Sequence, residues 1–270
     1  MAETNLVALK GALNTDSIQK KFSEMLGKKS TGFLTSITNV VQNNDLLQKA
    51  DVNSIILAAA QAASLDLPIN PNLGFAAIIP FNDRKSGKCV ATFQIQRDGW
   101  VDLCLRTGQF EYIANEIVYE GELVEKNRFT DTFVFDETKR TSDKVIGYMA
   151  SFKLTNGYKK TVYWTVEECK KHGMQYSQTF RKNYGLWVDN FHAMSLKSVL
   201  KHLLKKFAPK SIESIARAIE SDQASFVGDI DDSKAVYVDN GQSVEPVEFE
   251  EVVEDGVIEN SNENKETDFN

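Results

Sequence analysis

Cysteine, histidine and proline are scarce in this chain of 270 residues, which contains 3 Cys, 3 His and 5 Pro. The cysteines are odd in number and far apart, which fits neither a disulfide framework nor a paired-cysteine zinc site. We therefore expect Cys89, Cys104 and Cys169 to be reduced thiols, mostly buried. The histidines lack HExxH or Cys/His spacing, so we expect structural or surface positions for them and no zinc centre.

Glycine-rich nucleotide loops and long apolar runs are also missing. Neither GxxxxGK[ST] nor GxGxxG occurs, and without such a phosphate cradle an ATP-driven motor is not expected. No run of about 18 apolar residues occurs, and the opening MAETNLVALK lacks the basic and apolar regions of a signal peptide. We expect a cytoplasmic protein that does not contact a membrane.

The charge of the chain is divided unequally along its length. The formal net charge is −7, yet from 221 to 270 there are 15 Asp and Glu against 2 Lys. That segment carries −13, so the preceding 220 residues carry +6. A basic body joined to an acidic end favours polyanionic partners for the body, which the overall charge conceals.

Helical patterns occupy both ends of the basic body. Apolar residues recur at helical spacing within 31–47, with a stop signal at Asn43, and again after Asp51, a good N-cap. A longer, basic helix is predicted from about Gly185 to Phe207. With 42% hydrophobic residues, the chain has enough apolar side chains for a sizeable core.

Strand patterns occupy the middle of the chain. A β-hairpin is predicted over 74–96 and a short helix over 98–108. Four strands within 111–165 follow one another, the last two joined by the tight-turn signal Asn156 and Gly157, which predicts an antiparallel meander. This order indicates an α+β fold, in which the meander and the hairpin pack against several helices, including the long basic C-terminal helix.

The same patterns predict four regions. Residues 1–30 form an N-terminal helical segment suited to an oligomer contact, and residues 31–210 form the main core. A short helix covers 211–220. Residues 221–270 lose hydrophobic periodicity and are acidic, so we expect a disordered tail that is available for binding partner proteins.

The basic helix is the first candidate for a binding surface. Lys197, Lys201 and Lys205 are spaced i, i+4, i+8 and therefore share one face. A solvated lysine-rich face would explain this spacing in any amphipathic helix. However, no acidic residue lies between Asp189 and Glu213, so ion pairs within the helix cannot occupy these lysines and phosphates become the favoured partners.

The second candidate is the stretch 93–110, where a predicted strand ends and a helix begins. It combines amide side chains, cations and an aromatic ring, a set that suits single-stranded nucleic acid, although the ring equally fits core packing. The preceding hairpin loop adds positive charge. The residues concerned are Gln94, Gln96, Arg97, Trp100 and Arg106 in the stretch, and Arg84, Lys85 and Lys88 in the loop.

A group of carboxylates, Glu116, Glu120, Glu122 and Glu125, alternates along the predicted strands. Such a group can gather Mg²⁺ in a nuclease. Solvated strand faces explain the alternation more simply, so we expect no catalytic residue and no required metal or other cofactor. A Mg²⁺-dependent nuclease is the less favoured alternative.

Four blocks follow one another in a distinctive order: LDLPINPNLGFAAIIPF, FQIQRDGWVDLCLRTGQF, EIVYEGEL and WVDNFHAMSLKSVLKHLLKKFAP. Together they resemble the RecT family of phage and prophage single-strand annealing proteins. The resemblance implies ATP-independent binding of single-stranded DNA, annealing of complementary strands to a duplex, and assembly into rings or helical filaments. It also implies a bacterial host cell, a companion phage 5′ to 3′ exonuclease, and contact with the host single-strand-binding protein.

Two positions depart from the family pattern. The family commonly has aromatic-Lys-Gly where this chain has RDG at 97–99, and Lys-Lys-Thr where it has LKS at 196–198. Arg97 can replace a contact to the DNA backbone there, and Ser198 can replace a hydroxyl.

The two candidate regions combine into one hypothesis for the site. Lys197, Lys201, Lys205, Arg97 and Arg106 line a groove along the DNA backbone, and the resemblance places Lys197 and Lys201 at recurrent cationic positions of the family. Annealing needs no catalytic side chain, so the hypothesis assigns no enzyme activity. A passive single-stranded DNA-binding protein is the other alternative, since the same groove would serve it.

Overall fold

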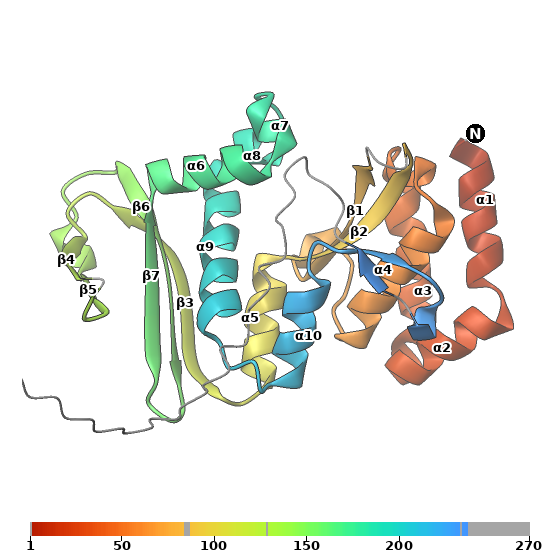
Figure 1. Ribbon diagram of the computed structural model, residues 1–270, viewed down its shortest axis with the longest axis horizontal. Coiled ribbons are helices and arrows are strands. Elements are labelled where there is room, and N and C mark those ends of the chain that lie inside the picture. Colours follow the sequence, from red (N-terminus) through yellow and green to blue (C-terminus); the bar gives the residue numbers. More distant parts are fainter. Residues whose placement is uncertain (1, 84–86, 128, 233, 237–270) are drawn as a thin grey trace, which may run out of the picture. The chain divides into compact units, whose positions relative to one another are not determined.

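A computed structural model of the protein describes residues 2–83, 87–127, 129–232 and 234–236. It contains antiparallel sheets and several helices, which confirms the predicted α+β class (Figure 1). The chain divides into two units, residues 1–240 and 241–270, and the elements described below belong to the first. Most of the predicted acidic tail lies outside the described residues.

Helices form the chain before the first strand. They are α1 (Ala2–Leu13), α2 (Asp16–Leu26), α3 (Ser30–Gln42) and α4 (Val52–Ser64). Helix α4 begins where the sequence predicts, because the Asp51 carboxylate accepts a hydrogen bond from the backbone N–H of Ser54 at 2.8 Å. Most of α4 is buried, and it packs against the hairpin that follows. Short 3-10 turns join the elements of the fold at Gly27–Lys29, Leu47–Lys49, Pro71–Leu73, Glu137–Lys139 and Ile230–Asp232.

The predicted hairpin consists of β1 (Ala76–Asn82) and β2 (Cys89–Ile95), which pair antiparallel. Strand β2 also hydrogen-bonds to a segment far away in the sequence. The backbone N–H of Phe93 donates to Ala224 O at 3.2 Å, and Gln223 N donates to Phe93 O at 2.8 Å. The backbone of β2 therefore pairs with β1 on one side and, at Phe93, with the chain around Ala224 on the other.

This contact moves the start of the predicted tail. Strand β8 (Ser225–Val227) pairs antiparallel with β9 (Lys234–Val236), and β8 packs on α4 and β2. Residues 221–232 and 234–236 are thus part of the folded body, although the sequence pattern assigned them to a disordered tail. The reason is that their backbone groups complete the hydrogen bonding of β2, which hydrophobic periodicity does not report.

The largest sheet contains β3 (Phe110–Tyr119), β6 (Val145–Leu154) and β7 (Lys159–Thr165), in the order β3-β6-β7. Neighbours are antiparallel, and β6 and β7 meet at the predicted turn, where Gly157 has a φ of +90°. The arrangement differs in one respect from the predicted meander. Between β3 and β6 in the chain, β4 (Leu123–Asn127) and β5 (Thr132–Phe135) form a separate two-stranded sheet, and among the described residues they pair with no other strand. Strand β4 is mostly exposed, so it does not extend the buried sheet.

The remaining helices surround this sheet and the hairpin. They are α5 (Arg97–Arg106), α6 (Val166–Tyr176), α7 (Gln178–Arg181), α8 (Leu186–Asp189), α9 (Phe191–Phe207) and α10 (Glu213–Ser221). Helix α9 lies against β6 and β7 and also contacts α5 (Figure 1). The predicted helix from Gly185 is divided by Asn190, which separates α8 from α9.

The cysteines and histidines occupy structural positions. All three cysteines are free, and burial raises the pKa of the Cys104 thiol to about 12 and that of Cys169 to about 11. The rings of His172 and His202 flank Trp164, with centroids 5.1 and 5.0 Å away. Burial lowers the pKa of His172 to about 4, so this ring is neutral at physiological pH.

No helix in the described part of the chain is both long and apolar enough to cross a membrane. Across 2–83, 87–127, 129–232 and 234–236, no three His, Cys, Asp or Glu are placed to share a metal ion. Two of the carboxylates considered for Mg²⁺ have partners near the β3–β4 turn. Glu120 pairs with Lys144 at 3.0 Å, and Glu122 accepts a hydrogen bond from Tyr119 N at 2.8 Å.

Candidate nucleic-acid interface

The three lysines of α9 differ in exposure, although their spacing predicts one shared solvent face. Lys197 is buried, with 8% of its surface exposed, Lys201 is half-buried and Lys205 is exposed. The difference arises because the end of β2 and the segment after α10 lie against the first part of α9. Burial of one side of the helix therefore divides the lysines into distinct environments.

Lys197 contacts two glutamine side chains that precede it by 101 and 103 residues. Its Nζ donates to Gln96 Oε1 at 3.0 Å and to Gln94 Oε1 at 3.4 Å. Gln94 belongs to β2 and Gln96 is the N-cap residue of α5, so the junction between strand and helix forms this site. Burial lowers the pKa of Lys197 to about 8; Asp222 raises it and Lys201 lowers it further.

Lys201 has an acidic partner from outside its own helix. Its Nζ lies 2.5 Å from Asp222 Oδ2 and donates to Gln223 Oε1 at 2.8 Å. The Asp222 side chain is 1% exposed, and its Oδ1 accepts a hydrogen bond from Ile95 N at 2.8 Å. The absence of acidic residues from the helix does not leave Lys201 without an ionic partner, because Asp222, which follows α10 in the chain, supplies one. This pair ties α9 to the end of β2.

The last turn of α9 presents the exposed cations of the helix. Lys205 and Lys206 are both exposed, and Lys206 Nζ lies 5.3 Å from the centroid of the Phe207 ring. Ser198, one turn after Met194, donates its hydroxyl hydrogen to Met194 O at 2.8 Å. The Ser198 hydroxyl therefore bonds within the helix in this structure.

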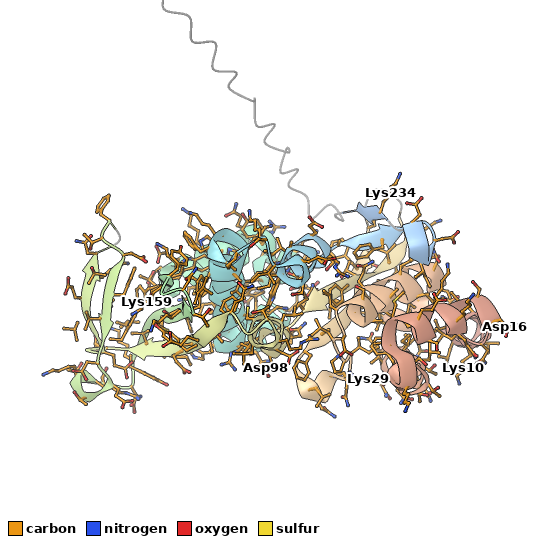
Figure 2. All side chains as sticks on the ribbon, turned by 90° about the horizontal axis from the view of Figure 1, so that it is seen from below. Lys10, Asp16, Lys29, Asp98, Lys159 and Lys234 are labelled. Carbon is orange, nitrogen blue, oxygen red and sulfur yellow. The ribbon has the colours of Figure 1, made fainter. Side chains whose placement is uncertain are left out.

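Arg97 is joined to a buried amide that connects four elements. Arg97 Nε donates to Asn115 Oδ1 at 3.1 Å, and Asn115 Nδ2 donates to Met149 O at 3.1 Å and to Leu196 O at 3.2 Å. These bonds link α5, β3, β6 and α9. The Arg97 side chain remains 45% exposed, with Asp98 Oδ1 at 3.4 Å from its Nη1. Asp98 lies at the molecular surface in Figure 2.

Arg106, at the other end of α5, is held by carboxylates and a carbonyl group. Its Nε lies 2.8 Å from Asp102 Oδ2, and its Nη2 donates to Leu65 O at 3.0 Å. Asp66 lies 4.0 Å away and also pairs with Lys29 at 2.8 Å. Arg106 therefore fastens α5 to the end of α4, and within the described residues no contact joins it to the lysines of α9.

The other predicted site residues have different surroundings. Trp100 is 1% exposed in the hydrophobic core, so its ring packs there instead of facing a base in this structure. Lys88 is exposed at the end of the hairpin loop. Arg84 and Lys85 lie outside the described residues.

Three residues of this site were missed from the sequence, namely Asn115, Asp222 and Gln223. Asn115 has a recognisable signal, since it is a polar residue at a position of β3 that is buried. Asp222 and Gln223 have none, because they fall in a segment whose composition resembles the tail. Among the described groups, Arg97, Lys205 and Lys206 are exposed hydrogen-bond donors, which suit phosphate oxygens.

Comparison with known proteins agrees with this chemistry. The RecT family matches residues 31–238. The chain is 42% identical over 215 residues to the uncharacterized protein YqaK of Bacillus subtilis (strain 168), covering 80% of this chain and 72% of that protein. It is 27% identical over 230 residues to protein RecT of Escherichia coli (strain K12), covering 78% of each. The chain therefore belongs to the RecT family, and this membership implies single-stranded DNA binding, self-association and strand annealing in recombination.

Proposed function

We propose that this protein anneals complementary DNA strands without ATP, acting as an oligomeric ring or filament that binds single-stranded DNA beside α9. One observation carries the proposal. At the β2–α5 junction the closest partners of Lys197 and Arg97 are the neutral amides of Gln96 and Asn115, at 3.0 and 3.1 Å. Neutral partners orient a cation without cancelling its charge. The exposed Asp98, 3.4 Å from Arg97, compensates the charge of that arginine only in part, so the junction keeps a positive field that attracts phosphates.

Annealing makes and breaks no covalent bond, so the protein has only to lower a kinetic barrier. Duplex stacking supplies on average about 1.4 kcal/mol per base-pair step, so the product needs no chemical drive. The barrier is the approach of two polyanions and the search for register. A protein that neutralises phosphates and leaves the base edges free lowers this barrier. An oligomer extends the effect along many nucleotides.

An annealing assay with complementary oligonucleotides, without ATP, tests the function. We expect the protein to speed annealing and to leave the strand lengths unchanged. A passive single-stranded DNA-binding protein would slow spontaneous annealing instead. A nuclease would shorten an end-labelled strand when Mg²⁺ is added. Because we propose no metal cofactor, annealing should persist in EDTA.

The acidic end of the chain is proposed to dock partner proteins, namely a phage 5′ to 3′ exonuclease and the single-strand-binding protein of a bacterial host, in the cytoplasm. The support is the −13 charge of residues 221–270. Because 221–232 and 234–236 belong to the folded body, the test is truncation after 238. We expect loss of partner binding with unchanged DNA affinity. A rise in DNA affinity at low salt would instead indicate that the acidic end competes with DNA.

A further inference from the structure

Lys197 is unusual because it is buried opposite neutral groups. Buried ammonium groups are generally paired with a carboxylate, since removal of a charge from water is costly. Here the atoms in hydrogen-bond range are the amide oxygens of Gln94 and Gln96. The carboxylate of Asp222 is instead bonded to Lys201 and Ile95 N. The two amides therefore supply the direct hydrogen bonds to the Lys197 ammonium group, and Asp222 attracts it from a longer distance.

This contact fixes the orientation of both amides. A protonated lysine can only donate hydrogen bonds, so the carbonyl oxygen of each glutamine must face it. The NH₂ group of each amide then points away from Lys197. Within the described residues, neither Nε2 donates to another protein group. Gln94 and Gln96 are both half-buried, so these donors are available to a ligand.

We propose that Lys197 is a positioning residue: it orients the Gln94 and Gln96 amides so that their NH₂ groups donate to phosphate oxygens of a bound single strand. The assignment rests on the proposed function. Arg97 follows Gln96 directly and is 45% exposed, so it supplies the charge that holds the same strand. The lysine itself does not touch the DNA.

Phosphate is a better ligand for these amides than a base. Annealing requires that Watson–Crick edges stay free, so contacts that help it lie on the backbone. A neutral donor also suits this task because it adds orientation with little salt dependence. We therefore expect loss of either amide to weaken single-strand binding by the same factor, whatever the base sequence of the strand.

The decisive experiment measures the salt dependence of single-strand binding for K197M and K205M, a matched pair on one helix. Each direct phosphate contact contributes about 0.7 to the slope of log K against log salt on single strands. We expect K205M to lower the slope by about 0.7 and K197M to leave it unchanged while weakening binding about tenfold at every salt concentration. A slope lowered by about 0.7 in K197M would show that the ammonium binds phosphate itself and would overturn the inference.

A second variant covers the case in which K197M does not fold. Q96E places a carboxylate against Lys197, which keeps the cation satisfied but removes one NH₂ donor. We expect Q96E to unfold at the wild-type temperature or above and to bind single strands about tenfold more weakly. Wild-type affinity in folded Q96E would contradict the proposal. Equal losses on oligo-dT and on a mixed sequence indicate the backbone, and a loss on one sequence alone would overturn the choice of phosphate.

Measurements on the wild-type protein and on K197M distinguish failure of the proposed function from failure of the positioning role of Lys197. If the wild-type protein neither binds single strands nor speeds annealing, the proposed function is wrong. If the wild-type protein does both and K197M follows K205M in slope, only the positioning role is wrong.

Discussion

The two ends of α5 both carry an arginine, yet the partners of these arginines differ in charge. At the first end Arg97 bonds to the amide of Asn115, and the neighbouring Lys197 bonds to the amides of two glutamines. At the last end Arg106 faces the carboxylates of Asp102 and Asp66. Arg97 also has a carboxylate, that of Asp98, but at 3.4 Å it is farther away than Asp102 is from Arg106, at 2.8 Å, so more of the positive field remains at the first end.

The comparison shows which cations are suited to DNA. The two side chains have similar exposure, 45% for Arg97 and 39% for Arg106, so exposure alone does not separate them. What separates them is the charge already compensated within the chain. Substitutions at the two ends of α5 should therefore have different effects on stability and on DNA binding.

Alanine substitution of the glycines near the two ends of α5 should give the largest difference in the free energy of unfolding. A Cβ on Gly99 would lie 2.0 Å from the backbone oxygen of Phe75, which cannot move without displacing β1. We expect G99A to lower the free energy of unfolding by about 4 kcal/mol or to prevent folding. Gly108 has open space but a φ of +67°, so G108A should cost about 1 kcal/mol. Chemical unfolding measures both variants. If G99A and G108A lose the same free energy of unfolding, Gly99 does not lie as close to Phe75 O as the structure shows.

Asp222 supports the first end of α5 through Ile95 and Lys201. We expect D222A to lower the free energy of unfolding by about 3 kcal/mol, because it leaves a buried N–H and a half-buried cation without their partner. D222N keeps an acceptor for Ile95 N and should lose about half as much. Urea unfolding measures the stability of both variants. A D222A protein as stable as wild type would show that the bonds of Asp222 to Ile95 and Lys201 do not stabilise the fold.

Alkaline pH should weaken DNA binding through Lys197. Burial lowers its pKa from 10.5 to about 8, with Asp222 opposing and Lys201 reinforcing the shift. Above that pH the amine gains a lone pair and no longer fixes the amides, so we expect affinity to fall roughly tenfold, about 1.4 kcal/mol, between about pH 7 and pH 9.

Stability should move in the opposite direction over this pH range. The unfolded chain keeps the lysine proton to higher pH than the folded protein does, so this group makes folding more favourable as pH rises from about 8 to 10.5. K197M is the control for both measurements. If K197M shows the same fall in DNA affinity as wild type, another group causes it.

The smallest contrast is between the arginines themselves. We expect R97A to lower the salt slope of single-strand binding by about 0.7. R106A should leave that slope unchanged and cost about 1 kcal/mol of stability, because it loses a partly exposed ion pair and the bond to Leu65 O. If R106A lowers the salt slope and R97A leaves it unchanged, the DNA contact lies at the last end of α5 and not at the first.

Local signals in the sequence predicted the elements well. The Asp51 cap, the helical spacing within 31–47 and the turn at Gly157 each depend on neighbouring residues, and all three were found. The order of strands was less accessible, because the β4–β5 hairpin separates β3 from its partner β6. Strands that are consecutive in the chain are not always neighbours in a sheet.

The site was predicted only in outline. Helical spacing places Lys197 and Lys201 one turn apart on α9, but their surroundings depend on residues about a hundred positions earlier or about twenty later. A search for acidic partners within the helix could not find Asp222. Likewise, an aromatic residue beside cations has the same pattern whether it is exposed or, like Trp100, buried.

Asn115 stiffens the protein where the proposed DNA surface meets the sheet. Its amide bonds to Arg97, to a carbonyl of β6 and to a carbonyl of α9, so α9 cannot swing away from the sheet without breaking these buried bonds. A hinge at this helix is therefore unfavourable. We expect the freedom that two strands need while they search for register to come from the DNA and from motion between whole subunits.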